Sequence, residues 1–296
     1  MSDPAALRSR AETLAGPLPA LLAGAQHLAR TVMLGSHGRR RPGQGDEFWQ
    51  YRPAIPGDAA RSVDWRRSAR SDGHFVREKE WQAAQSVMLW VDQSASMSFA
   101  SKGQAPKSDR AAELALATAI LLGHGGERVG LCDHDLPPRT GSLQLLRLAQ
   151  ALGAGDAAAQ PPDYGAPLAR EMPSRSHALF LSDFLGDVTP VEGALLEAAD
   201  RGISGVLVQV LDPQEEAFPF DGRTIFESMG GTLSHETLKA GELRNRYLDR
   251  LAERKDRLLQ LCRTTGWQYT VHHTDTPPQS ALLWIYGALE RDHRCG

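Results

Sequence analysis

Three side chains with oxygen ligands alternate along a segment that follows a largely apolar run. The segment is Asp92-Gln-Ser94-Ala-Ser96, and the run before it covers residues 86–91. A carboxylate and two hydroxyls at alternate positions can converge on one side of a tight loop. There they suit Mg²⁺, a hard cation that prefers oxygen ligands. A second carboxylate, Asp183, follows another apolar run at 178–181. Together these residues predict a cation site that leaves a position for an oxygen from outside.

The same loop has a plainer interpretation, in which Asp92 and Ser94 only satisfy the backbone amides of a turn. The second acid favours the cation site, because the carboxyl ends of parallel strands meet at one edge of a sheet. We therefore expect Asp183 to lie at the same edge as Asp92.

Apolar runs alternate with helical patterns from residue 86 onward, and this alternation predicts the elements that must position those side chains. We expect strands at 86–91, 128–132, 178–181, 203–211 and 267–271. We expect helices at 108–122, 142–152, 190–200, 242–265 and 280–291. Ser108 or Asp109 is expected to cap the first helix. Strands that are continuously apolar are buried on both faces, so we expect an α/β fold with a doubly wound, mostly parallel sheet.

The first 84 residues do not show this alternation. Residues 5–30 are helix-like, whereas residues 35–81 are rich in Gly, Pro, Arg and aromatic residues and have no clean period. We expect a helical and loop/strand extension over residues 1–84, packed on an α/β domain over residues 85–296.

Composition excludes several classes of protein. The 296 residues carry 33 Lys and Arg against 36 Asp and Glu, a formal net charge of −3, which gives no reason to expect bulk nucleic-acid binding. The three cysteines are far apart and odd in number, so neither a disulfide framework nor a cysteine-rich zinc site is supported. The apolar stretch near the start is interrupted by Pro17 and Pro19, which argues against a signal peptide. We expect a cytoplasmic protein.

The loop at Asp92 and the stretches around it resemble a known family. Residues 87–97 look like the first strand and metal-ion-dependent adhesion site of the von Willebrand factor A-like fold. The rest of the chain resembles the bacterial family called domain of unknown function 58. The segments that carry this resemblance before the loop are Gly43-Gln-Gly45-Asp46-Glu47-Phe48, Tyr51-Arg52, Pro56-Gly57-Asp58, Arg61, Val63-Asp64-Trp65, Ala69-Arg70 and Val76-Arg77-Glu78. Those after it are Arg128-Val-Gly-Leu131, Leu136-Pro-Pro-Arg139 with Gly141, Val208-Gln-Val-Leu-Asp212-Pro213, Phe218-Pro-Phe220 with Gly222 and Arg223, and Thr274-Asp275.

The resemblance implies a metal site. It makes Asp92, Ser94 and Ser96 the ligands of Mg²⁺ or Mn²⁺ in the first loop, and Asp183 the acid of another loop. Sites of this kind usually draw a threonine from an intervening loop, where this chain has Pro161-Pro-Asp163-Tyr164-Gly165. Two alternatives stay open: Asp163 takes the place of the threonine, or the metal is bound only together with a partner.

The resemblance also implies a function without enzymatic activity. Members of such a family look like partners of MoxR-type AAA+ ATPases, and this chain would be a metal-dependent protein–protein interaction module, an adaptor or co-chaperone-like partner of such an ATPase. The partner would supply an Asp or Glu to the metal. No GxxxxGK[ST] string occurs, so ATP hydrolysis must belong to a partner. No membrane association is expected.

Two other functions compete with this interpretation. Asp133-His-Asp135 follows an apolar run and is similar to the paired acids of aspartyl-nucleophile phosphatases, with Asp133 as the nucleophile. A basic cluster from Arg39 to Arg70 is interleaved with aromatic residues, a combination that can stack on and neutralise a nucleic acid. Acids within the cluster favour internal salt bridges and aromatic packing instead.

Overall fold

The computed structural model describes residues 25–29, 42–55, 63–70, 73–80, 84–154, 161–227, 234–237 and 239–292. The chain forms two compact units. The smaller comprises residues 35–84, and the larger contains residues 85–296 together with the helical turn at 25–29. The expected extension over 1–84 is therefore not one unit, because Ala25, Leu28 and Ala29 are buried in the core of the larger one. The rest of the expected helix at 5–30 lies outside the described residues.

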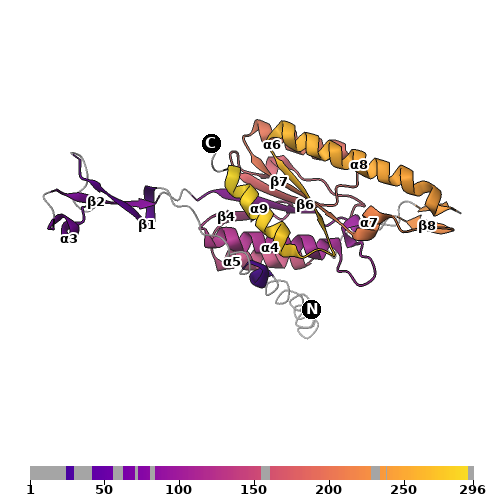
Figure 1. The fold of residues 1–296 in the computed structure, drawn as a ribbon, viewed down its shortest axis with the longest axis horizontal. Helices are drawn as coiled ribbons and strands as arrows, with labels where there is room; N and C mark the ends of the chain where they lie inside the picture. Colours follow the sequence, from indigo (N-terminus) through magenta and orange to yellow (C-terminus); the bar gives the residue numbers. More distant parts are fainter. Residues whose placement is uncertain are drawn as a thin grey trace, which may run out of the picture. The chain divides into compact units, whose positions relative to one another are not determined.

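The larger unit is built around a six-stranded sheet (Figure 1). Its strands are, in chain order, β3 (Ser86–Val91), β4 (Arg128–Leu131), β5 (Leu136–Arg139), β6 (His177–Ser182), β7 (Ser204–Leu211) and β10 (Gln268–His273). Their spatial order is β10-β7-β6-β3-β4-β5, and every neighbouring pair is parallel except β4 and β5. The molecule is thus an α/β protein with a mostly parallel sheet, whose parallel strands all end at the same edge.

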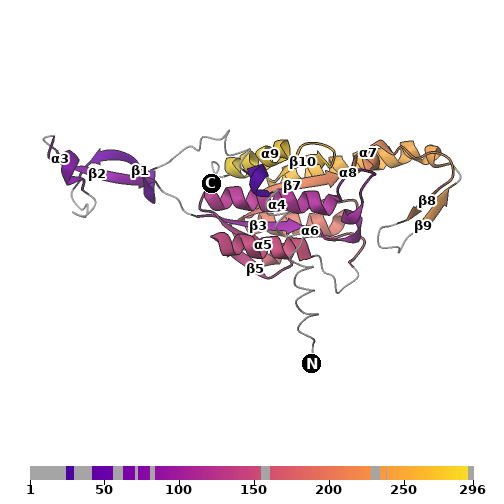
Figure 2. The same ribbon diagram turned by 90° about the horizontal axis from the view of Figure 1, so that it is seen from below.

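Helices cover both faces of the sheet (Figures 1 and 2). They are α4 (Lys107–His124), α5 (Ser142–Ala154), α6 (Val188–Asp200), the short α7 (Pro213–Ala217), α8 (Ala240–Thr265) and α9 (Pro278–Asp292). Helices α4, α5 and α9 pack on the face to which Val87 and Leu89 of β3 point. Helices α6 and α8 pack on the opposite face, with Met88 and Trp90. Because successive residues of a strand point to opposite faces, β3 is apolar from Val87 to Val91.

The start of α4 differs from the expectation. The helix begins at Lys107 with Pro106 as its N-cap, and no side chain caps it. The prediction that Ser108 or Asp109 caps this helix was therefore wrong. Pro106 has a ψ of 149°, so the extended chain ends there and the helix starts two residues earlier than a Ser108 cap would place it. Lys107 belongs to the first turn, and its side chain is buried.

Four short elements were not expected from the sequence. They are β5, α7, β8 (Thr224–Glu227) and β9 (Ser234–Thr237). β8 and β9 form a separate antiparallel pair. α7 follows β7 directly and begins with a capping box, in which Asp212 accepts a hydrogen bond from within the first turn and Glu215 accepts one from the backbone N–H of Asp212.

The smaller unit is an antiparallel pair of strands with one short helix. The strands are β1 (Pro42–Pro53) and β2 (Phe75–Glu80), and the helix is α3 (Trp65–Ser68). Asp64 caps α3 by accepting a hydrogen bond from the backbone N–H of Arg67 at 3.0 Å. Arg39, Arg40, Arg41 and Arg61 of the predicted basic cluster lie outside the described residues.

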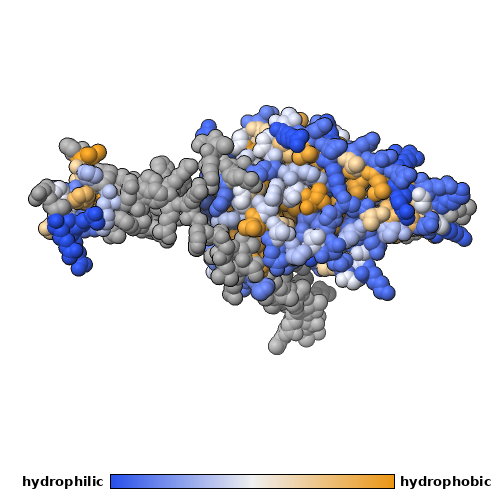
Figure 3. Space-filling view, in the orientation of Figure 1, coloured by the Kyte–Doolittle hydropathy of each residue, from blue (hydrophilic) through white to orange (hydrophobic). Residues whose placement is uncertain are grey.

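The visible surface of the larger unit is mainly hydrophilic, and hydrophobic side chains form separate patches on the face drawn in Figure 3. Large exposed hydrophobic side chains include Leu143, Leu168, Leu196 and Leu283. Single exposed side chains of this kind are normal in soluble folds and mark no site by themselves. Within the described ranges, every helix is too short or too polar to span a lipid bilayer.

Candidate functional site

Three neighbouring strands of the central sheet each end in a buried aspartate. Asp92 follows β3, Asp183 follows β6 and Asp212 follows β7, and these residues are only 2%, 1% and 0% exposed. The strands run parallel and in register, and the backbone N–H of Asp92 donates to Leu181 O of β6 at 2.9 Å. The structure therefore brings Asp92 and Asp183 to one edge of the sheet, as the parallel arrangement predicts.

The Asp92 carboxylate is held by two hydrogen bonds. Its Oδ1 accepts from the backbone N–H of Ser94 at 2.8 Å, and its Oδ2 accepts from the hydroxyl of Ser182 at 2.6 Å. Burial raises the pKa of Asp92, hydrogen bonds from Ser182 and Ser94 lower it, and the negative charge of Asp183 raises it further, with a net rise. Each carboxylate oxygen has two lone-pair sites, so Asp92 can still bind a cation.

Two hydroxyls lie beside this carboxylate. The Oγ atoms of Ser94 and Ser96 are 3.3 Å apart and both residues are buried. A short 3₁₀ turn, Ala95–Ser98, places them on one side of the loop. The loop is fixed from across the site, because Ser96 N–H donates to the backbone oxygen of Asp163 at 3.0 Å. The predicted ligands Asp92, Ser94 and Ser96 are therefore close together, and Asp163 lies on the segment that faces them.

Gly165 lies directly against Asp92. A Cβ atom at this position would be 2.4 Å from Asp92 Oδ1, a distance that no real side chain tolerates. One oxygen of the Asp163 carboxylate, Oδ1, is buried near by on the same loop. The loop that carries Pro161 to Gly165, for which the resemblance left a role of Asp163 open, thus lies directly against the site.

Asp183 is engaged differently from Asp92. Its Oδ1 accepts from the backbone N–H of Leu185 at 3.0 Å, and its Oδ2 accepts from the ammonium of Lys107 at 2.8 Å. Phe184, between Asp183 and Leu185 in the sequence, has a φ of 49°, in the left-handed region that a bulky residue rarely adopts. Strain of this kind persists where the surroundings over-determine the backbone, and it is concentrated at functional sites. Both oxygens of Asp183 therefore already have donors.

Lys107 was not predicted as a site residue. Its side chain is 0% exposed, and its Nζ donates to Asp183 and, at 2.6 Å, to Glu215 of α7. The ring of Phe99 lies 5.8 Å from Nζ. Burial lowers the pKa of Lys107, but the charges of Asp183 and Glu215 outweigh burial and the pKa is raised. The ammonium is therefore a permanent positive charge inside the edge.

Asp212 ties the edge to more distant segments. Its Oδ1 accepts from Gln214 N–H at 2.8 Å, and its Oδ2 accepts from Ser101 N–H at 2.9 Å and lies 3.4 Å from the Thr274 hydroxyl. The rule that led to Asp183 also leads to Asp212, since Asp212 directly follows an apolar strand. No pattern in the sequence points to Lys107, whereas Glu215 belongs to the helix-start signal that begins at Asp212.

The donor set fits a hard divalent cation on the side of Asp92. Among the described residues, no Lys, Arg or His pairs with the Asp92 carboxylate, so a buried negative charge faces two hydroxyl oxygens without a cation. In the same ranges, no three His, Cys, Asp or Glu side chains gather as metal ligands, so hydroxyls, water or a partner must complete the shell. On the other side Asp183 already binds Lys107, so its part would be played through charge or a bridging water.

The residues of the competing phosphatase hypothesis lie at a different strand end. Asp133 follows β4, and its Oδ2 accepts a hydrogen bond from the indole N–H of Trp90 at 2.6 Å. Its backbone N–H donates to Glu171 at 2.7 Å. The hypothesis stays a prediction: turnover of a phosphate ester that Asp133→Asn abolishes and Asp92→Ala does not would support it.

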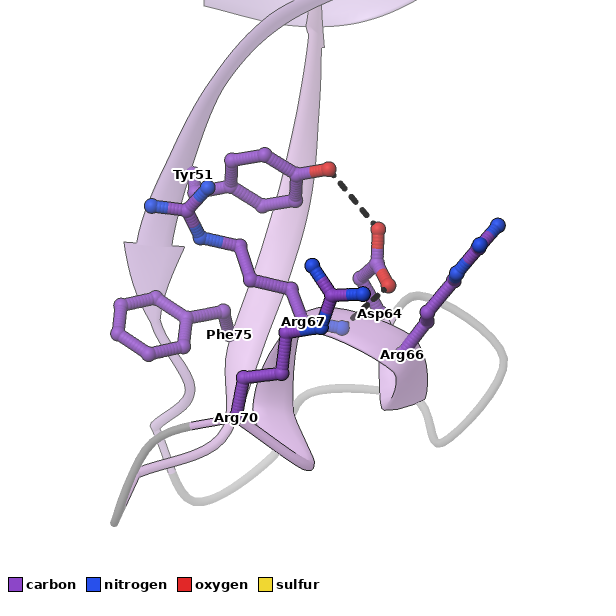
Figure 4. A pocket seen from close by; sticks show the side chains of 6 residues that line it. All are labelled: Tyr51, Asp64, Arg66, Arg67, Arg70 and Phe75. Atoms are coloured by element: carbon purple, nitrogen blue, oxygen red, sulfur yellow. Dashed lines mark hydrogen bonds between the residues drawn. The ribbon is translucent and has the colours of Figure 1, made fainter.

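The smaller unit contains a pocket of about 430 Å³ (Figure 4). It is lined by Tyr51, Asp64, Arg66, Arg67, Arg70 and Phe75. The Arg67 guanidinium lies over the Tyr51 ring at 4.2 Å, and the Tyr51 hydroxyl donates to Asp64 at 2.9 Å. Within the described part of the chain, none of the three guanidinium groups forms an ion pair. The aromatic packing predicted for the basic cluster is present here, whereas the predicted salt bridges of these arginines are not.

A known protein family matches most of the chain. The family model described as Protein of unknown function DUF58 covers residues 50–257, more than half of the 296 residues. The chain belongs to the DUF58 family. The matched region contains Asp92, Lys107, Asp183 and Glu215.

Three mycobacterial proteins, each described as uncharacterized, are similar to this DUF58 chain. They are Rv1480 and MT1527 of two Mycobacterium tuberculosis strains, H37Rv and CDC 1551, and Mb1516 of Mycobacterium bovis. Each is 29% identical over 211 residues, which are 66% of this chain and 64% of the relative. The match thus spans just under two thirds of the relatives' own length.

Two solved structures are also similar to the chain. One is an aerotolerance-related membrane protein from Bacteroides fragilis NCTC 9343, and the other is the conserved hypothetical protein BatB from Bacteroides thetaiotaomicron. Each covers 70% of this chain and 100% of its own, with 15% sequence identity and a TM-score of 0.44.

Proposed function

We propose that this DUF58 protein is a non-enzymatic docking module with a von Willebrand factor A-like fold, whose sheet edge binds a protein partner through a divalent cation. The observation that carries the proposal is the unpaired charge of Asp92, which is buried beside the Ser94 and Ser96 hydroxyls. The strand order, with the antiparallel β5 at one margin, supports the same fold.

Asp92, Ser94 and Ser96 would hold Mg²⁺ or Mn²⁺, with Asp183 and Asp163 adding negative charge from the facing loops. When bound, the cation supplies positive charge and an open coordination position for an Asp or Glu side chain of the partner. The Asp92 carboxylate is already held in place before a cation binds. Ser94 N–H and the Ser182 hydroxyl fix both oxygens of Asp92, so little side-chain freedom is lost on binding.

A MoxR-type AAA+ ATPase is the proposed partner, and the resemblance of the chain to ATPase-associated proteins supports this choice. The docking module would then work in the cytoplasm, where such an ATPase has access to ATP. The direct test uses the purified MoxR-type ATPase of the same bacterium and the full DUF58 chain in a pull-down, with Mg²⁺ or with EDTA. We expect capture with Mg²⁺ and at least a tenfold loss with EDTA.

The variants separate the site from the fold. Asp92→Ala removes the carboxylate, and Gly165→Ala keeps the carboxylate but places a Cβ against it. We expect both to abolish capture. Asp135→Asn is the control, because Asp135 is an exposed aspartate in the turn between β4 and β5, and Asn tolerates its φ of 47°. Undiminished capture by Asp92→Ala, with EDTA as well as with Mg²⁺, would overturn the metal-dependent docking.

A further inference from the structure

The ion pair between Lys107 and Asp183 has no place in a docking site that consists of metal ligands alone. Lysine is almost never fully buried unless it is paired, and here the side chain is 0% exposed with two carboxylate partners. One of these partners, Asp183, is the acid that the second loop contributes to the site. The ammonium therefore sits within the charge distribution that a bound cation would experience.

We infer that Lys107 is an internal cation of the docking edge, a positioning residue that holds Asp183 away from direct metal ligation. Its charge makes metal binding weak and favours an acidic partner. The inference rests on the proposed function and specifies its regulation. It concerns a residue that acts through Asp183 and does not touch the metal.

The charge of Lys107 acts in opposite directions on the two ligands. A positive charge inside the edge repels a divalent cation, so it weakens metal binding. The same charge attracts a carboxylate, so it favours the acidic side chain of a partner once the metal is in place. Because the ammonium is excluded from water, screening by solvent is small and both effects are larger than those of a surface lysine.

Glu215 partly neutralises the charge of Lys107, so substitutions at Glu215 and at Lys107 change the local charge in opposite directions. Its Oε1 accepts from Lys107, and its Oε2 accepts from the backbone N–H of Asp212 at 3.0 Å. Removing the negative charge of Glu215 leaves Lys107 less compensated. A merely structural ion pair would make Lys107 and Glu215 variants equally harmful, whereas an internal cation makes their effects on metal affinity opposite in sign.

The test measures binding of Mn²⁺ alone to the full chain by electron paramagnetic resonance. We expect Lys107→Met to tighten Mn²⁺ binding about tenfold or more, and Glu215→Gln to weaken it severalfold. The gain should depend on Asp183, so the double variant Lys107→Met with Asp183→Asn returns close to the wild-type affinity. Glu216→Gln is the matched control, because the neighbouring Glu216 pairs with Lys255 and His273 and not with Lys107.

Each outcome supports or overturns the inference. Unchanged Mn²⁺ affinity in Lys107→Met or in Glu215→Gln overturns it, and so does a loss of affinity in both. If Lys107→Met unfolds in EDTA, we expect Mn²⁺ to restore its circular dichroism spectrum, and the Glu215→Gln result decides the sign independently. If Mn²⁺ binds no variant while the chain still captures the ATPase, the inference about Lys107 is wrong. The docking surface would then bind its partner without a metal ion.

Discussion

The polar edge of the larger unit and the basic pocket of the smaller unit use charged side chains in opposite ways. In the edge, contacts join residues far apart in sequence: Asp92 and Ser182 are separated by 90 positions, Lys107 and Asp183 by 76, and Lys107 and Glu215 by 108. In the pocket, Asp64 accepts from the backbone N–H of Arg67, three positions away, and from the hydroxyl of Tyr51, 13 positions away. The edge therefore exists only in the folded chain, whereas parts of the pocket are local structure.

The charged side chains of the edge and of the pocket also differ in their exposure to solvent. Lys107 and Asp183 are 0% and 1% exposed, and their interaction is little screened by water or salt. Arg66, Arg67 and Arg70 are exposed, so their charges are largely screened. Charge at the edge should therefore govern both stability and ligand binding, while charge in the pocket should leave stability almost unchanged.

Loss of the Lys107 charge should have the largest effect on stability. We expect Lys107→Met to lower the free energy of unfolding in EDTA by about 3–5 kcal/mol, because Asp183 is left as an uncompensated buried charge. Urea denaturation followed by circular dichroism measures it. Lys239→Met is the control: Lys239 pairs with Glu242 at the surface, and its loss should cost less than about 1 kcal/mol. Equal losses in the two variants would erase the contrast between buried and exposed charge.

Acid should lower the stability of the larger unit through His272, the second-last residue of β10, which is 4% exposed. Burial, followed by the charges of Arg110 and His273, lowers the pKa of His272 from 6.5 to about 4. The neutral ring is also the form that can accept at Nε2 from the Arg110 guanidinium, 3.2 Å away. Because the unfolded chain takes up this proton first, stability is complete above pH 6.5 and falls as the pH is lowered toward 4.

The expected loss through His272 is about 3 kcal/mol over that interval. Urea midpoints between pH 7 and pH 4 measure it, and the difference between wild type and His272→Gln isolates this residue from other titrating groups. His124→Gln, at an exposed position on α4, is the control variant. A His272→Gln curve parallel to the wild type would contradict the role of this ring.

Removing the charge of Asp92 should raise stability and abolish the response to metal. Because burial raises the pKa of Asp92, the carboxylate destabilises the fold at pH values above its folded-state pKa. We expect Asp92→Asn to gain about 1 kcal/mol at pH 7 in EDTA, a gain that shrinks as the pH falls toward 3.8. Mg²⁺ should raise the melting temperature of the wild type and not that of the variant. A variant less stable than the wild type in EDTA would show that hydrogen bonding outweighs charge at this position.

The local half of the site could be predicted from sequence. The strand before Asp92 has the predicted bounds, 86–91, because its residues are apolar on both faces. Asp92, Ser94, Ser96 and Asp183 follow strands, and a parallel sheet brings strand ends together whatever the loops contain. Asp212 and the short helix after it were equally readable, since Asp212-Pro213 with Glu215 is a helix-start signal.

The other half depends on tertiary structure. A lysine in the first turn of a helix is normally solvated, and only the folded chain reveals that Lys107 is enclosed by loops from far along the sequence. Ser108 and Asp109, which follow Lys107, are residue types that often cap helices, and the N-cap was therefore predicted there. β5 was missed for a related reason: Pro137 and Pro138 argue against a strand, yet they are tolerated because β5 is an edge strand.

The smallest effects are expected in the basic pocket. Arg67 lies over the Tyr51 ring, and we expect Arg67→Ala to lower the free energy of unfolding by about 0.5–1 kcal/mol. Arg66→Ala, at an exposed position on the same helix, should change it by less than about 0.5 kcal/mol.

Filter binding of a single-stranded oligonucleotide at two salt concentrations tests whether the exposed charges of the pocket bind a nucleic acid. With a net charge of −3 for the whole chain, we expect no retention at physiological salt. Retention that falls steeply with salt, with a slope reduced by about one in either variant, would instead make the pocket a nucleic-acid site whose charges act on ligands without acting on the fold.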